Sequence, residues 1–97
     1  MATYISLINW TDQGIKNVKE TIERSQQAGD LMSSLGVNLK EIYWTVGPYD
    51  VVGISEAPDE ETATASLLAL GAGGAVRTTT LRAFNHEEMA RILQKLG

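Results

Sequence analysis

The chain has 97 residues, of which 43% are hydrophobic, and a formal net charge of −4 at pH 7. This length and apolar content are typical of one globular domain, here residues 1–97, and exclude a disordered chain. Because Lys and Arg form no stripe, we expect no nucleic acid or membrane partner. Because there is no Cys, disulfides, thiol catalysis and thiolate metal sites are excluded.

The first predicted element is a strand over Thr3–Asn9, a β-branched run between polar residues. Both of its faces are mostly apolar, with Ile5 and Leu7 on one and Tyr4 and Ile8 on the other, so each side of the sheet should be covered. The segment lacks the basic region of a signal peptide, and no apolar run approaches the roughly 20 residues of a transmembrane helix. We therefore expect a soluble, cytoplasmic protein.

The second predicted element is one continuous helix from Thr11 to about Leu35. Thr11 is a good N-cap, and Asp12 complements the helix dipole. Apolar residues recur near helical spacing and predict a buried stripe of Ile15, Val18, Ile22, Met32 and Leu35. Gly29 interrupts this stripe, which resumes after it, and Gly36 is a suitable residue to close the helix.

A hairpin follows, with strands over Lys40–Val46 and Val51–Glu56 joined by a Gly-Pro turn. Pro58 and Asp59 then begin a second helix, whose acidic first turn complements its own dipole and whose body is Ala63–Leu70. Three glycines between residues 71 and 74 end this helix. A phosphate cradle is not indicated, because these glycines form no GxGxxG motif and follow a helix instead of opening one.

The last predicted elements are a strand over Val76–Phe84 and a helix capped by Asn85. Glu88 completes a capping-box pattern, and the predicted buried stripe of this helix is Met89, Ile92, Leu93 and Leu96. The order βαββαβ plus a terminal helix predicts a ferredoxin-like α+β fold. Its antiparallel sheet has the order 4-1-3-2, with both main helices on one face.

Two helices can cover only one face of such a sheet, and the other face carries apolar residues. Adjacent Tyr43 and Trp44 must point to opposite faces. The uncovered side would be a larger apolar patch than monomers usually expose. We therefore predict a homodimer, or a higher oligomer built from dimers, in which two sheets pack face to face over more than about 1,000 Å².

Several runs carry a resemblance that extends over the whole chain. They are Thr11–Ile15, Tyr43–Val52 with the sequence YWTVGPYDVV, the following Glu56–Asp59, and Val76–Phe84. With these runs the chain resembles the GYD-domain family, named for a Gly-x-Tyr-Asp type motif after the second strand. Pro48 departs from the family pattern, in which an acidic residue is common. The resemblance implies a dimeric α/β-barrel protein and no established activity, although relatives of that barrel include cofactor-independent monooxygenases and isomerases.

Topology brings the end of the first strand, the hairpin turn and the start of the fourth strand to one rim of the sheet. Polar and aromatic residues at or near this rim are the candidate ligand-binding set: Trp10, Thr11, Gln13, Tyr43, Trp44, Tyr49, Asp50 and Arg77. The alternative is that the aromatic residues serve packing and the polar ones serve turns. Asp50 is expected to accept hydrogen bonds from loop amides or a rim residue. Arg77 either pairs with Asp50 or holds a carboxylate ligand.

His86 is the only histidine, and it falls at the start of the last helix, away from this rim. A single imidazole without Cys or a carboxylate pair is a weak ligand set, so we predict no metal and no cofactor. The sequence also shows no nucleophile–base pair. We expect a small-ligand-binding or interaction module, and the alternative is a cofactor-independent enzyme of the dimeric α/β-barrel type.

Overall fold

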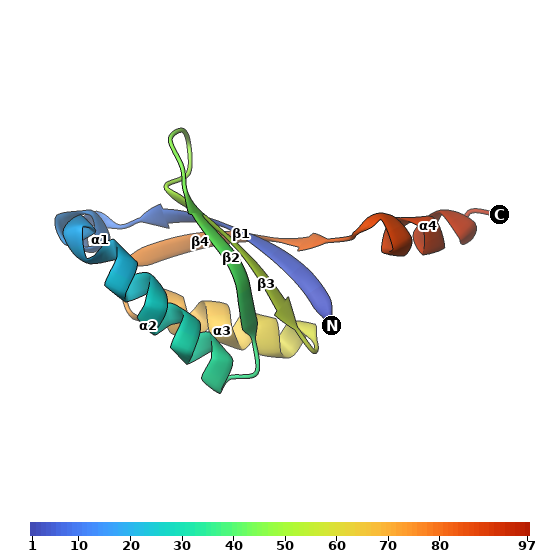
Figure 1. The fold of residues 1–97 in the computed structure, drawn as a ribbon, viewed down its shortest axis with the longest axis horizontal. Coiled ribbons are helices and arrows are strands. Elements are labelled where there is room, and N and C mark those ends of the chain that lie inside the picture. The colour runs from blue at the N-terminus through green and yellow to red at the C-terminus, as the bar shows by residue number, and fades with distance from the viewer.

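The computed structural model describes residues 1–97 as a four-stranded sheet with two helices packed on one face (Figure 1). The elements in chain order are β1 (Ala2–Trp10), α1 (Asp12–Lys16), a 3₁₀ turn η1 (Val18–Glu20), α2 (Thr21–Ser34), β2 (Asn38–Trp44), β3 (Val51–Ala57), α3 (Glu60–Ala72), β4 (Val76–Ala83) and α4 (His86–Gln94). The strand order is β2-β3-β1-β4 and all neighbours are antiparallel. The ferredoxin-like fold and its sheet order are therefore confirmed.

The expectation of one continuous helix up to Leu35 is wrong, because the chain breaks after α1. Asn17 leaves helical geometry, with φ −107° and ψ 25°, and the 3₁₀ turn follows before α2 begins. Thr11 caps α1 as predicted, since its side chain accepts from the Gly14 amide at 3.2 Å. Gly14 lets α1 lie close to the sheet, because a Cβ there would overlap the carbonyl oxygen of Ala75.

The break also explains why the predicted apolar stripe is not buried as a unit. Met32 is buried, whereas Ile15 is 49% exposed and Ile22 is 64% exposed. The interruption changes the rotation of α1 relative to α2, so Ile15 no longer shares a face with the residues of α2. Ile22 and Met32 both lie on α2, but ten residues apart they point in different directions. The predicted end is confirmed, because Gly36 follows α2 with φ +90°, a conformation that favours glycine.

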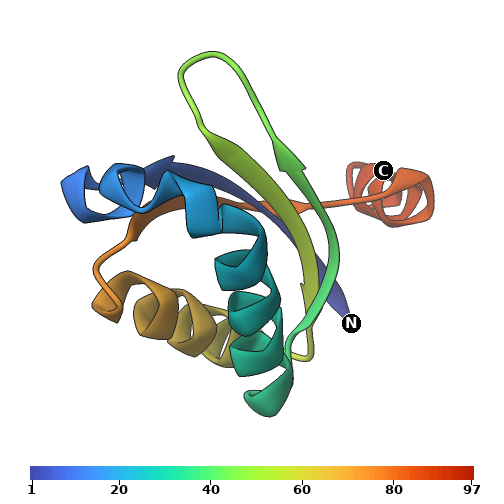
Figure 2. The same ribbon diagram turned by 60° about the vertical axis from the view of Figure 1, so that its left-hand side comes forward.

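The buried core is small and lies where α2 ends and α3 begins, a region that we call the packed end. It consists of Tyr4, Met32, Val37, Ala57 and Ala63. Figure 2 shows α2 and α3 close together here and diverging toward the start of α2 and the end of α3. Only 11 of the 97 residues are buried in the single chain, so much of its apolar surface is still exposed to water.

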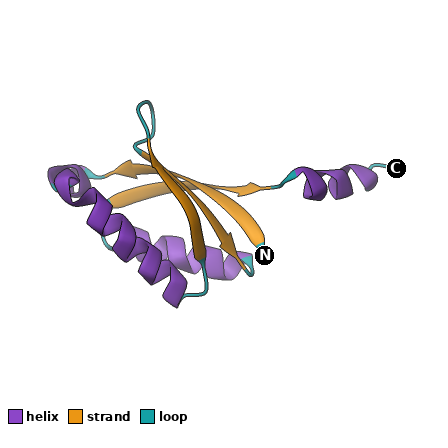
Figure 3. Ribbon diagram, in the orientation of Figure 1, coloured by secondary structure: helices purple, strands orange, loops and turns teal.

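The sheet face without helices (Figure 3), which we call the open face, carries apolar residues at its centre. Register places its apolar side chains on neighbouring strands: Ile5 and Leu7 of β1, Val52 and Ile54 of β3, Tyr43 of β2 and Leu81 of β4. Tyr43 is 54% exposed and Leu81 is 48% exposed. No element of this chain covers that face.

Helix α4 extends away from the rest of the chain at the end of β4 (Figure 1). The predicted capping box is confirmed, because Asn85 Oδ1 accepts from the Glu88 amide and Glu88 Oε1 accepts from the Asn85 amide, both at 2.9 Å. The prediction that its apolar stripe is buried is wrong, since Leu93 is 52% exposed and Leu96 is 80% exposed. The pattern is amphipathic, but in the single chain α4 has no surface to pack against.

The two edges of the sheet are formed by β2 and β4. On β2 the pairing with β3 is interrupted by a register shift between Leu39 and Glu41. Lys40, the residue within this irregularity, lies 3.5 Å from Glu56 through its Nζ atom. None of the helices is both long and apolar enough to cross a membrane.

Candidate functional site

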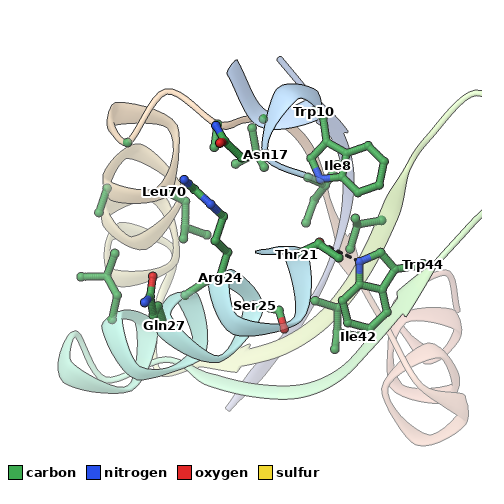
Figure 4. A pocket seen from close by; sticks show the side chains of 18 residues that line it. Ile8, Trp10, Asn17, Thr21, Arg24, Ser25, Gln27, Ile42, Trp44 and Leu70 are labelled. Atoms are coloured by element: carbon green, nitrogen blue, oxygen red, sulfur yellow. Dashed lines mark hydrogen bonds between the residues drawn. The ribbon is translucent and has the colours of Figure 1, made fainter. Parts of the chain in front are cut away.

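A cavity of about 280 Å³ lies between the sheet and the two helices, on the side away from the packed end (Figure 4). From the sheet it is lined by Ile8, Trp10, Ile42, Trp44, Val51 and Val76, and from the helices by residues that include Asn17, Thr21, Arg24, Ser25, Ala28, Leu31, Ala69 and Leu70. Its volume is near the lower limit of small-molecule sites, which are typically about 300–1,000 Å³. A mostly apolar lining with a few polar groups is also typical of such sites.

The cavity exists because the helices present small side chains to the sheet here. Thr21, Ser25 and Ala28 follow one another at helical spacing on α2, and Ala69 and Gly73 line the cavity from α3 and its C-cap. These side chains are too short to fill the space between the diverging helices and the sheet. Large aromatic residues on the strands take up only part of that space.

Two polar features face the cavity from the α2 side. Trp44 Nε1 donates to Thr21 Oγ1 at 2.9 Å, which ties β2 to the first turn of α2. Arg24 extends from α2 toward Leu70 of α3 (Figure 4). Arg24 Nε lies 3.5 Å from Glu20 Oε2, and the Arg24 side chain is 42% exposed. The structure shows no hydrogen bond donated by this guanidinium within the chain.

At the neighbouring rim, Asp50 joins the hairpin turn to the end of β1. Its Oδ2 atom accepts from the Trp10 amide at 2.9 Å, and its own amide donates to the Ile8 carbonyl at 2.9 Å. The prediction that Asp50 accepts a hydrogen bond from a rim residue is confirmed. Beside it, the Tyr49 carbonyl accepts from Thr45 Oγ1 at 2.7 Å, so this part of the rim is a bonded turn.

Thr11 and Gln13 bind the loop between α3 and β4. The Thr11 amide donates to the Ala75 carbonyl at 3.1 Å, and its hydroxyl donates to the Gly74 carbonyl. Gln13 Nε2 donates to the Gly73 carbonyl at 3.5 Å. These polar groups hold the loop that borders the cavity in place. They donate to backbone carbonyls of that loop and do not point into the cavity as ligand-binding groups.

Tyr43 and Arg77 lie on the open face, away from the cavity. Tyr43 is opposite Val52, and its hydroxyl donates to Glu41 Oε2 at 3.0 Å. This hydrogen bond, followed by the negative charge of Glu41, raises the pKa of Tyr43. Arg77 is exposed and opposite Asn9, and no ion pair joins it to Asp50.

Of the eight candidate residues from the sequence, the structure therefore places only Trp10 and Trp44 at the cavity. Sequence reasoning missed the lining contributed by α2, including Thr21, Arg24 and Ser25. A signal was present, since small residues recur at positions 21, 25 and 28. It was overlooked because the apolar residues of the same segment were assigned to the buried face.

His86 is exposed as the first residue of α4, which extends away from the sheet beyond the end of β4. Nowhere are three or more His, Asp or Glu residues grouped so that they could hold a metal ion. The cavity lining also contains no Asp, Glu, His, Lys or Tyr side chain. Its chemistry is therefore limited to apolar contact, neutral hydrogen bonds and the positive charge of Arg24.

Comparison with known proteins gives three further findings. The profile of the GYD domain matches residues 4–93. A protein of Thermus thermophilus, named glutamine synthetase and cystathionine beta-lyase binding protein, is 36% identical over 84 residues, which are 86% of this chain and 88% of that protein. The crystal structure of TTHA0845, also from Thermus thermophilus, is similar with a TM-score of 0.56 and 29% identity, covering 88% of this chain and 95% of the other.

Proposed function

Because this chain belongs to the GYD-domain family, we propose that it is an interaction module that binds a metabolic enzyme, with glutamine synthetase and cystathionine beta-lyase as the first candidates. The observation that carries this proposal is the 36% identical relative, whose name describes binding to those two enzymes and which matches over most of both chains. The apolar surfaces left exposed by the fold support it, since large exposed patches mark interaction sites.

The surface that we assign to the enzyme partner is α4. This helix extends from the rest of the chain and carries exposed Met89 and Leu93, with Phe84 just before it and Leu96 in the turn after it. An amphipathic helix that presents anchors at such spacing binds by placing its apolar side in a groove of the partner. The capping box fixes the start of α4 without help from a tertiary contact.

Titration calorimetry with purified glutamine synthetase and cystathionine beta-lyase tests this assignment. The unmodified protein should bind at least one of the two enzymes, and Leu93→Glu should weaken that binding by about tenfold or more, because it places a charge on the apolar side of α4. Leu68→Glu, at a 69% exposed position on α3, is the matched control and should bind normally. Absence of binding to both enzymes by the unmodified protein would refute the proposal.

The open face is assigned to a second copy of the chain. It places six apolar residues side by side across all four strands, and the helices of the same chain lie on the opposite face. Packing two such faces together would form the sheet-to-sheet core that a chain with so few buried residues lacks. A two-fold axis makes the same patch complementary to itself.

Sedimentation at micromolar concentration tests the homodimer. The unmodified chain should sediment as a dimer, and a charge at Tyr43→Glu or Leu81→Glu on the open face should dissociate or unfold it. Leu68→Glu should sediment like the parent. A stable, folded monomer of the unmodified chain would exclude the sheet-to-sheet dimer, whatever the result with the enzyme partners.

A second function, binding of a small molecule, is favoured by the cavity lined by Trp10 and Trp44. We assign binding and not acid–base catalysis to this site, because its lining offers no side chain suited to serve as a general base. A fragment library can be screened by ¹⁵N NMR, since the only two indole N–H signals of the protein come from this site. Ala28→Leu, which fills the cavity, should abolish the shifts caused by bound fragments.

A further inference from the structure

We propose that the cavity selects a small aromatic carboxylate, a class that neither the family nor its relatives identify. This inference rests on the proposed small-molecule function of the same site. Its structural basis is that one cationic side chain faces a space that is mostly apolar and bordered by two indoles.

The charge preference follows from Arg24. Its Nε atom faces Glu20 at 3.5 Å, and the planar guanidinium has further N–H groups suited to a bidentate contact with a carboxylate. No Asp or Glu is among the cavity-lining residues, so an anion entering the space meets no negative charge there. Glu20, as the half-exposed partner of Arg24, is the one carboxylate that competes for the guanidinium.

The aromatic preference follows from the opposite side of the cavity. Trp10 and Trp44 border it there, while Arg24 and Leu70 lie toward α3 (Figure 4). The Trp44 ring is held by its bond to Thr21 Oγ1, and a ring already fixed in place loses little entropy when a ligand packs against it. Aromatic pairs gain stabilisation beyond that of the area that they bury.

Thr21 lies on the indole side of the cavity, across from the Arg24 guanidinium (Figure 4), and supplies a hydrogen-bond donor there. Its oxygen accepts from Trp44 Nε1, which leaves its own hydroxyl proton available to donate. A planar ring carrying one carboxylate on a short arm therefore matches the cavity in size, polarity and charge. Dicarboxylic molecules would bring a second charge against apolar walls.

The test uses phenylacetate, its neutral analogue phenylacetamide and the aliphatic carboxylate hexanoate, each titrated into the full chain and followed through the two indole N–H signals. Phenylacetate should shift both signals saturably and bind about tenfold more tightly than either other probe. Arg24→Gln should weaken phenylacetate about tenfold and leave phenylacetamide unchanged. Arg91→Gln on α4 removes an equal charge outside the cavity and should have no effect.

Three results would overturn the inference. If phenylacetate and phenylacetamide bound equally, or Arg24→Gln affected them equally, the cavity would bind small molecules without selecting a carboxylate. If hexanoate bound as well as phenylacetate, the aromatic preference would be wrong. If no probe shifted either indole signal, the selection of a carboxylate would be wrong, and if Ala28→Leu also left the fragment screen unchanged, the small-molecule function itself would fail.

Discussion

The packed end and the cavity are built from the same sheet and the same two helices, yet one is filled and the other is hollow. At the packed end Met32 of α2 reaches between Tyr4, Val37, Ala57 and Ala63. At the cavity the same helix presents Thr21, Ser25 and Ala28. The difference shows that side-chain length along one helix, together with the divergence of two helices, decides where this fold holds a core and where it holds a space.

The largest effect should come from removing a side chain at the packed end. Met32→Ala should destabilise the protein by about 2–5 kcal/mol, because it deletes buried atoms and leaves a void in a small core. Ile42→Ala, at the cavity, should cost clearly less, since that side chain already borders unfilled space. Urea unfolding of both variants measures the difference. Equal losses would show that the two ends are packed alike.

A smaller effect is expected where the rim closes beside the cavity. Asp50→Ala should cost about 1–3 kcal/mol, because the Trp10 amide loses its acceptor. Asp50→Asn is the control, since its amide oxygen can still accept that hydrogen bond. Thermal unfolding should place the Asn variant between the Ala variant and the parent. An unchanged midpoint for Asp50→Ala would show that the bond contributes nothing.

Acid should loosen the packed end through the N-cap of α3. The Asp59 carboxylate accepts from the Thr62 amide at 2.7 Å, and this backbone hydrogen bond lowers the pKa of Asp59 below its ordinary value of 3.8. Because the pKa of Asp59 is lower in the folded state, its hydrogen bond contributes fully to stability above the pKa of the unfolded state. This contribution is lost as pH falls through the pKa of the folded state. The protection factor of the Thr62 amide against hydrogen exchange should therefore fall in that acidic range. Asp59→Asn should remove this pH dependence.

The smallest effect on stability should come from a residue distant from both the packed end and the cavity. His86 is exposed at the start of α4 and forms no hydrogen bond through its side chain. His86→Gln should change the free energy of unfolding by less than about 0.5 kcal/mol, as surface substitutions usually do. Chemical denaturation checks this, and a loss of enzyme binding or of ligand binding in this variant would assign His86 a role that its position does not indicate.

The strands and their order were predictable because local and topological signals agree. The hairpin with its Gly-Pro turn, the Asp59 cap and the Asn85–Glu88 capping box each set an element boundary within a residue or two. The uncovered face was also predictable, since Ile5 and Leu7 alternate with inward-facing Tyr4 and Ser6. These features depend on neighbours in sequence or on a period of two, which a single sequence displays directly.

The cavity and the broken first helix were not predictable in the same way. The break at Asn17 comes just after Gly14, which lies against Ala75, and a contact between segments about 60 residues apart is not visible in a sequence. The rim was correctly assembled from topology, but whether its residues face a ligand depends on hydrogen bonds such as those of Thr11 and Asp50. Arg24 was missed because an Arg on a helix is normally expected to be a surface residue. Only the three-dimensional structure shows the cavity beside it.

The irregular pairing of β2 has a consequence for how this chain avoids aggregation. An edge strand presents unpaired backbone groups that can recruit the edge of another chain and extend a sheet indefinitely. The register shift between Leu39 and Glu41 disturbs that edge, and Lys40 places a charge within it. A strand from another chain could therefore not form a regular hydrogen-bond ladder along β2, and it would meet the charge of Lys40. Such an edge disfavours growth of a fibre. It favours contacts through the faces of the sheet, which end in a closed pair.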